Sequence, residues 1–212
     1  MRGEIAIVDG FADPRHAQTL KRDYADRPLA HLPGFVVKRL FRRWRDRPDV
    51  FFLIAQMDDD TCGFVFGQSV GAKPWRQLLI DPVALPFAVA ALVFERTRSR
   101  IGQGVRPETG SAFPPYDKAE CQVRREWGPR EAANVEFIFV DPAFRGRNVA
   151  GVLLAAFGDR LRAAGIGTGL AYIAHSNQAS IRAFSKAGWS IYADGGTLRA
   201  CHRIDTGTNL WN

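Results

Sequence analysis

The chain has 212 residues, 46% of them hydrophobic, which is enough to bury the core of one domain over residues 1–212. Its three cysteines, Cys62, Cys121 and Cys201, are widely spaced, odd in number and without metal-ligand or C-x-x-C spacing, which argues against a disulfide framework or a metal site. The net charge of +7 leaves nucleic acid open as a partner.

The first element predicted along the chain is a strand at residues 4–8. Its apolar run is too short for the hydrophobic region of a secretory signal, so we expect a cytoplasmic protein. Helical spacing then predicts helices over residues 13–24 and 33–44. Two apolar runs, 50–55 and 63–67, flank an acidic turn and predict a β-hairpin.

The second predicted helix carries the densest group of basic residues. One side of it is apolar, through residues such as Val36, Leu40 and Trp44. The charged side is a solvated outer face, or it attracts a phosphate-rich ligand by its positive field. No signature of a nucleic-acid-binding module accompanies it, so we do not expect a nucleic-acid partner. The basic residues are Lys38, Arg39, Arg42, Arg43, Arg45 and Arg47.

The segment over residues 71–132 is longer than a connection within a compact domain requires. It begins with a long apolar run at 78–94, which Asp81, Pro82 and Pro86 interrupt, so a transmembrane span is not expected. We predict one or two packed helices followed by a polar loop at 98–130. The insertion only covers hydrophobic surface, or it forms a lid or a wall of a ligand site, or it forms a docking surface for a membrane or a carrier-bound substrate.

A strand, a basic loop and a helix follow the insertion. Residues 135–140 are apolar apart from Glu136, and an Asp-Pro turn leads into the loop at 145–151. Apolar residues then recur at helical spacing as far as Gly165. The first turn of a helix has unpaired N–H groups and a partial positive charge, so this loop can hold a diphosphate.

The remaining residues predict a strand, a helix and a hairpin. The strand covers 169–174 and the helix 176–187, where Asn177 is a suitable N-cap and Gly188 a suitable residue after the carboxyl end. Strands at 189–193 and 198–204 then pair through an Asp-Gly-Gly turn.

Two segments of this region resemble the GNAT superfamily of acyl-CoA-dependent N-acyltransferases. The loop at 145–150, Arg-Gly-Arg-Asn-Val-Ala, resembles the family's cofactor motif Q/R-x-x-G-x-G/A, with Asn148 in place of the middle glycine. Asparagine tolerates a positive φ better than most residues. Residues 177–189 resemble the second family pattern, N-x-x-A-x-x-x-Y-x-K-x-G-F. Two motifs in the right order are far more specific than either one.

The resemblance implies a mixed α/β fold, with a mostly antiparallel sheet that is flanked by helices and splayed between the fourth and fifth strands. Here a helical and loop insertion, residues 71–132, would precede the fourth strand. The implied acyl donor is acetyl-CoA, and no metal is implied. The implied cofactor-binding residues are Ile138, Val140, Arg145, Gly146, Arg147, Asn148, Val149, Ala150, Gly151 and Asn177.

The implied chemistry is direct attack of an amine on the thioester in a ternary complex. Glu136 is the candidate base. Alternation along a strand places it on the same face as Ile138 and Val140, and a carboxylate within an otherwise apolar strand suggests a functional role. A solvated position for Glu136 and a water chain in its place are both open alternatives. The tyrosine of the second motif is Phe184 here, and phenylalanine cannot protonate a leaving thiolate. The nearby candidates for acid or base are Tyr172, His175, Ser176, Ser185 and Tyr192.

The resemblance therefore predicts an N-acetyltransferase that acts on a primary amine of a small molecule, such as an amino sugar, a sugar nucleotide or an amine metabolite. Part of the acceptor site would come from residues 71–132. A protein or peptide N-acetyltransferase is an alternative, and so is a non-catalytic acyl-CoA-binding or interaction protein. A homodimer is one open arrangement.

Overall fold

The computed structural model describes residues 4–11, 32–70, 72, 82, 84–87, 132–194 and 197–204. The helix predicted at 13–24 and nearly all of the segment 71–132 lie outside these residues, so both stay predictions. The chain forms two compact units. The first comprises Met1–Gly10, Pro48–Ala72 and Ser111–Asn212, and the second comprises Phe11–Arg47 and Lys73–Gly110.

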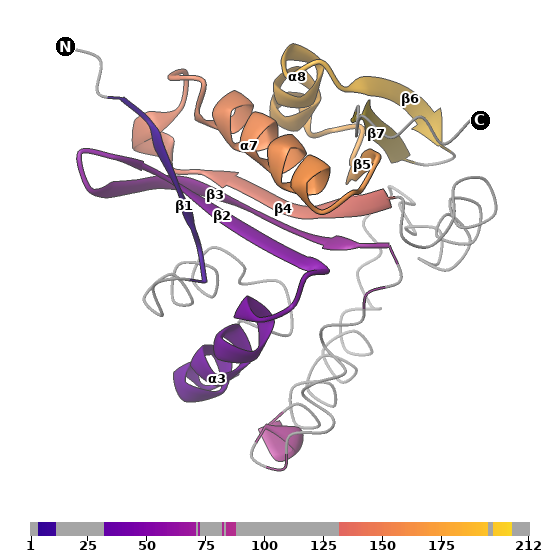
Figure 1. Ribbon diagram of the computed structural model, residues 1–212. Helices are drawn as coiled ribbons and strands as arrows, with labels where there is room; N and C mark the ends of the chain where they lie inside the picture. The colour runs from indigo at the N-terminus through magenta and orange to yellow at the C-terminus, as the bar shows by residue number, and fades with distance from the viewer. Residues whose placement is uncertain are drawn as a thin grey trace, which may run out of the picture. The chain divides into compact units, whose positions relative to one another are not determined.

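The first unit contains a seven-stranded sheet of order β1-β2-β3-β4-β5-β7-β6 (Figure 1). Every neighbouring pair is antiparallel except β4 and β5, which are parallel. This arrangement confirms the predicted mixed, mostly antiparallel sheet. The strands are β1 (Ala6–Asp9), β2 (Val50–Met57), β3 (Asp60–Ser69), β4 (Ala132–Val140), β5 (Thr168–Ile173), β6 (Ser190–Asp194) and β7 (Thr197–Arg203).

The hairpin between β2 and β3 has the acidic turn that the sequence predicts. Asp58 and Asp59 have φ values of 52° and 67°, so both are in the left-handed region. Two such residues suit the right-handed twist of the paired strands, and aspartate adopts this conformation more readily than most residues. The sequence therefore closes this hairpin without glycine.

Two helices follow β4 and β5 in the first unit. A short 3-10 helix, η1 (Pro142–Phe144), leads into α7 (Val149–Ala163), and α8 (Gln178–Lys186) follows β5. Asp141 begins η1 by accepting a hydrogen bond from the Ala143 N–H at 2.9 Å. Gly165, with a φ of 71°, follows the carboxyl end of α7, as predicted.

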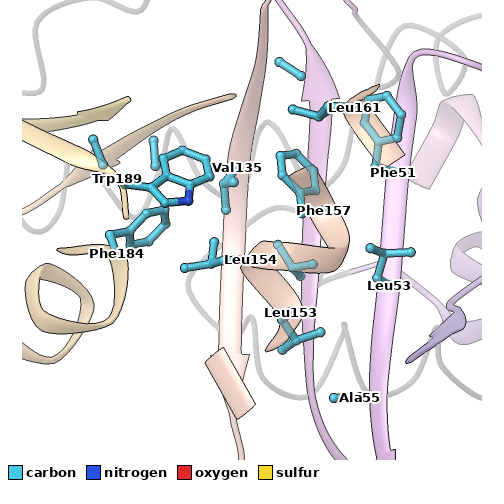
Figure 2. Close-up of a cluster of buried hydrophobic side chains, with 14 of the residues drawn as sticks. Phe51, Leu53, Ala55, Val135, Leu153, Leu154, Phe157, Leu161, Phe184 and Trp189 are labelled. Carbon is cyan, nitrogen blue, oxygen red and sulfur yellow. The ribbon is translucent and has the colours of Figure 1, made fainter. Parts of the chain in front are cut away.

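Helix α7 packs across one face of the sheet, against β2, β3 and β4 (Figure 1). Its buried side chains meet apolar residues of β2 and β4, and Phe157 meets Phe51 edge to face at 5.8 Å between ring centroids. Figure 2 shows these side chains together with Phe184 and Trp189, which extend the cluster toward α8. The labelled α7 residues are Leu153, Leu154, Phe157 and Leu161.

The other face of the sheet carries a row of aromatic rings. Phe64 stacks on Phe139 and Phe66 stacks on Phe137, with ring centroids 5.6 and 5.7 Å apart. Phe52 meets both Phe64 and Phe66 edge to face. Because successive side chains of a strand point to opposite faces, these rings mark the face away from α7.

The strands β3 and β4 approach closely below α7, at Gly67. A β-carbon at this position would lie 2.6 Å from the carbonyl oxygen of Asn134 and 2.6 Å from the ring of Phe157. Real β-carbons do not come this close to backbone atoms, so any larger residue would move β4 or α7.

Helix α3 (Gly34–Arg45) belongs to the second unit and has the predicted amphipathic pattern. Val36, Leu40 and Trp44 are buried, whereas Arg39, Arg42 and Arg45 are exposed. These exposed arginines are consistent with a solvated face and with a face that attracts a phosphate-rich ligand. Among the described residues, no helix is long and apolar enough to cross a membrane.

Replacement of Gly67 by alanine should lower the free energy of unfolding by about 1–3 kcal/mol, because the added methyl group overlaps the Asn134 carbonyl. Chemical denaturation measures this loss. Gly34→Ala is the matched control, since no atom lies within 4 Å of its added methyl group and alanine favours the helix. Equal stabilities of the two variants would contradict the close packing at Gly67.

Candidate active site

The strands β4 and β5 are paired over only part of their lengths. Their ladder runs from Ala132 opposite Thr168 to Val135 opposite Ala171 and then stops. Beyond it, β4 continues to Val140 paired with β3, and β5 continues to Ile173 paired with β7. The sheet is therefore splayed between its fourth and fifth strands, as predicted.

The loop after β4 has the backbone conformation that the cofactor motif requires. Gly146 and Asn148 have φ values of 81° and 64°. Asn148 is the N-cap of α7 in the left-handed conformation, so it adopts the conformation expected of the glycine that it replaces. The departure from the motif therefore leaves the local backbone suited to the loop.

Unpaired amides gather at this end of α7. Within the described residues, the N–H groups of Gly146 and of residues 148–151 donate no backbone hydrogen bond, and the first bond of the helix runs from the Val152 N–H to the Asn148 carbonyl at 3.1 Å. These donors and the positive end of the helix dipole form an anion-binding surface.

Two arginines add positive charge beside these amides. Arg145 is exposed, and its Nε donates to the Val140 carbonyl at 3.3 Å. Arg147 lies over the ring of Phe144 at 5.5 Å, and its guanidinium contacts the Met57 sulfur at 3.6 Å. Both side chains stay close to the loop, where their charge would complement a bound anion.

Asn177 caps α8 at the loop that follows β5. Its Oδ1 accepts a hydrogen bond from the Ser180 N–H at 3.1 Å. The capping role predicted from sequence is confirmed. The amide NH₂ of Asn177 is not used in this bond, so its predicted contact to the cofactor stays a prediction.

Glu136 lies at a β-bulge in β4. Phe66 of β3 is opposite Phe137 and Gly67 is opposite Val135, so Glu136 is an extra residue. Gln68 faces away from α7, because the neighbouring Gly67 faces Phe157. Glu136 shares this face, since its Oε1 accepts a hydrogen bond from Gln68 Nε2 at 3.0 Å.

The bulge overturns the parity argument for Glu136. Ile138 and Val140 pack with the cluster under α7, whereas Glu136 lies on the opposite face beside Gln68. A strict alternation would place all three on one face. The half-buried carboxylate is nevertheless at the point where the β4–β5 ladder ends.

Tyr172 lies on the same face as Glu136, across the splay on β5. Its neighbours Ala171 and Ile173 belong to the α7 cluster, so Tyr172 faces the other way. Arg199 of β7 is its register partner, donates to its hydroxyl at 3.4 Å and lies over its ring at 5.5 Å. Tyr172 is thus a half-buried hydroxyl at the edge of the splay.

The other candidate acids and bases lie farther from the end of the ladder. His175, Ser176 and Ser185 are exposed, the first two in the turn before α8 and the third on α8 itself. Tyr192 is on the edge strand β6, where its hydrogen bond with Cys201 and burial raise its pKa to about 12. Tyr192 is therefore protonated at neutral pH.

Two buried side chains near the site have structural roles. The Cys62 thiol is next to the loop, and desolvation raises its pKa, which argues against a thiolate nucleophile. Phe184 is 2% exposed and meets Trp189 edge to face at 4.9 Å, so it has the packing role predicted for it.

Sequence reasoning missed three polar residues on the face away from α7: Gln68, Asn134 and Arg199. Gln68 and Asn134 are buried opposite each other in β3 and β4. Polar residues inside apolar strands were the available signal. In the described part of the chain, no three His, Cys, Asp or Glu residues lie together where they could hold a metal ion.

A family model, the acetyltransferase (GNAT) family, matches residues 17–189. The chain belongs to the acetyltransferase (GNAT) family. It is therefore an acyl-CoA-dependent acetyltransferase. No curated protein shows a significant match to the sequence.

Solved GNAT structures have the same fold at low sequence identity. An acetyltransferase of the family from Streptococcus pneumoniae is 12% identical, with a TM-score of 0.56 over 95% of this chain and 99% of that one. The protein yncA from Salmonella typhimurium, solved with its cofactor acetyl-CoA, is 15% identical, with a TM-score of 0.55 over 95% and 94%. The GNAT domain of PAT from S. lividans is 17% identical, with a TM-score of 0.53 over 95% and 90%.

Replacement of Gly146 by glutamate should abolish measurable CoA binding, because it adds bulk and negative charge beside the unpaired amides of α7. The matched control is Gly165→Glu at the other end of the same helix. Both glycines have a positive φ and open space around the added β-carbon, so both variants should lose about 1 kcal/mol of stability. Calorimetric CoA titration that finds equal affinity in the two variants would overturn the loop assignment.

Replacement of Phe184 by leucine should lower the free energy of unfolding by about 1 kcal/mol, through loss of its edge contact with Trp189. Turnover per folded molecule should not change, because phenylalanine has no proton to transfer. Thermal melts and acetyl-transfer rates measure the two effects. Loss of transfer in a normally folded variant would show that Phe184 has a direct role.

Proposed function

We propose that this GNAT protein transfers an acetyl group from acetyl-CoA to a primary amine of a small molecule, such as an amino sugar, a sugar nucleotide or an amine metabolite. The observation that carries the proposal is the position of Glu136. Its carboxylate is half-buried where the β4–β5 ladder ends, and the anion-binding loop follows the same strand.

The residues at the carboxyl end of β4 fit acetyl-CoA. The diphosphate would bind the amides of residues 146 and 148–151, with Arg145 and Arg147 adding charge. Gly151 keeps this cradle open, since a β-carbon there would lie 2.6 Å from Asn148 Oδ1. The edge of β4 around Ile138 and Val140 and the amide of Asn177 would hold the pantetheine arm. When bound, acetyl-CoA supplies the thioester carbonyl that the amine attacks.

Glu136 would take the proton from the amine before or during attack, directly or through one water molecule. Gln68 donates to one carboxylate oxygen, which fixes the orientation of Glu136. The freed lone pair forms the C–N bond, the C–S bond breaks, and the sulfur leaves with a proton. Backbone N–H groups at the edge of β4 beyond Val135 would stabilise the carbonyl oxygen.

Tyr172 is our candidate for protonating the leaving sulfur. In the bond with Arg199 the Tyr172 oxygen is the acceptor, so this bond itself does not use the phenolic proton. His175 remains a weaker candidate, because it is exposed in the turn beyond β5. The pair of Glu136 and Tyr172, one on each side of the splay, would serve proton removal and proton delivery.

Small-molecule acceptors are favoured by the depth of the polar groups beside Glu136. Gln68 and Asn134 are 8% and 5% exposed, so only a narrow group of an acceptor could reach them. Thiol release with a panel of small amines, alongside peptides with free amino termini, tests this choice. Faster release with peptides than with every small amine would favour a peptide acetyltransferase.

Replacement of Glu136 by glutamine should lower kcat about 10²–10⁴-fold at neutral pH, because the base is lost while the shape is kept. CoA affinity should not change. The activity of the variant should rise as the pH approaches the pKa of the amine, near 10, because free amine then forms without a base. A pH–rate profile like that of the wild type would exclude Glu136 as the base.

A further inference from the structure

Two buried oxygens on the face away from α7 have no hydrogen-bond donor. Gln68 and Asn134 are 8% and 5% exposed, and among the described residues neither Gln68 Oε1 nor Asn134 Oδ1 has a hydrogen-bond partner. The two residues are direct register partners on β3 and β4. Buried polar atoms without a partner are rare in native proteins, so each one requires an explanation.

The hydrogen bond between Gln68 and Glu136 determines which way the Gln68 amide is oriented. An ionised carboxylate can only accept, so the NH₂ group of Gln68 must be the one that contacts Glu136 Oε1 at 3.0 Å. The carbonyl oxygen of the same amide is then left as an acceptor. Gln68, Asn134 and Glu136 therefore bring oxygen acceptors together on one face.

These oxygens lie in apolar surroundings at the point where the splay begins. On one side the rings of Phe66 and Phe137 stack, and on the other side Val70, Ala132, Leu170 and Cys201 form an apolar cluster. The last paired residues of β4 and β5 are Val135 and Ala171, directly beside Asn134 and Glu136. A charge-assisted hydrogen bond is strong in such an environment.

A ligand that fits these oxygens must supply several hydrogen-bond donors to them. A primary ammonium has three N–H donors, no acceptor and a charge opposite to that of Glu136. We propose that Gln68 Oε1, Asn134 Oδ1 and the Glu136 carboxylate form the subsite that binds the acceptor amine in its protonated form. This inference rests on the proposed function and specifies how that site recognises its acceptor.

The subsite also accounts for the order of events. The ammonium binds through its three N–H groups, one proton passes to the Glu136 carboxylate, and the neutral amine then attacks the thioester. The product amide is uncharged and keeps one N–H, so it satisfies only one of the three acceptors and leaves readily. Secondary amines should bind more weakly than primary amines, and quaternary ammonium ions should not bind.

The experiment compares methylammonium chloride with tetramethylammonium chloride at equal concentration. The two cations have the same charge, but the second has no N–H donor. Thermal melts of the wild type, Asn134→Leu and Gln68→Met are recorded in each salt, with Thr168→Val as the control. Thr168 is a buried polar residue of β5 on the same face that makes no part of the subsite.

We expect methylammonium to stabilise the wild type and Thr168→Val more than tetramethylammonium does, and this difference should vanish in Asn134→Leu and Gln68→Met. Without salt, Asn134→Leu should melt at the same temperature as the wild type or higher, since an unpaired buried oxygen has been removed, whereas Gln68→Met also loses the hydrogen bond to Glu136 and should melt lower. The KM for the best amine of the panel should rise about 10-fold or more in Asn134→Leu. Either variant alone carries the test, because each removes a different oxygen.

Equal stabilisation by the two salts in the wild type would overturn the subsite and would mean that these oxygens hold only water. A salt difference that persists in both variants would also overturn it. CoA affinity is measured for every protein. A wild type that does not bind CoA would count against the proposed function. A wild type that binds CoA and transfers acetyl groups, but is stabilised equally by the two salts, would count against the subsite only.

Discussion

One extra residue in β4 is the constraint on which the splayed sheet depends. Glu136 and Phe137 together face Phe66 of β3, and a bulge of this kind bends its strand and increases the local twist. Residues of β4 before the bulge pair with β5, whereas the residues after it pair only with β3. The bulge therefore separates the part of β4 that holds the sheet together from the part that can bind a ligand.

Packing of α7 keeps the bent strand in place. Phe157 lies against Gly67, and a β-carbon at Gly67 would reach both this ring and the Asn134 carbonyl. The buried side of the helix thus fits β3 and β4 just before the bulge. Because η1 is short and Asp141 is anchored to the Cys62 carbonyl at 2.9 Å, the amino end of α7 stays close to the end of β4. A site on such rigid elements is positioned more precisely than one on a long loop.

The sequence was sufficient to predict most described elements and the loop. Helical spacing located α3 and α7, and the two acidic residues of the hairpin turn have the positive φ that such a turn requires. The loop at Gly146 was predictable because its conformation is local. Asn148 shows the same point, since its left-handed backbone follows from its own side chain and its place at the helix end.

The bulge could not be predicted from the sequence. The face of the sheet on which Glu136 lies could therefore not be predicted either. Residues of β4 on both sides of the strand are apolar, so no alternation reveals where the phase changes. The partnership of Gln68 and Glu136 joins residues 68 positions apart, and only the β3–β4 register creates it. Asn134 likewise becomes a candidate site residue only because the register places it opposite Gln68 of β3.

The polar group beside the bulge is costly to the fold, and this cost is informative. An unpaired buried oxygen costs about 1–3 kcal/mol, against a total stability of about 5–15 kcal/mol for an ordinary domain. Both oxygens of this kind lie on the face of Glu136, and the described side chains under α7 include none. Apolar residues could fill these two positions, as they fill their neighbours Val135 and Leu170. A sequence that keeps amides there gives up stability at a place where a ligand with N–H donors can restore it.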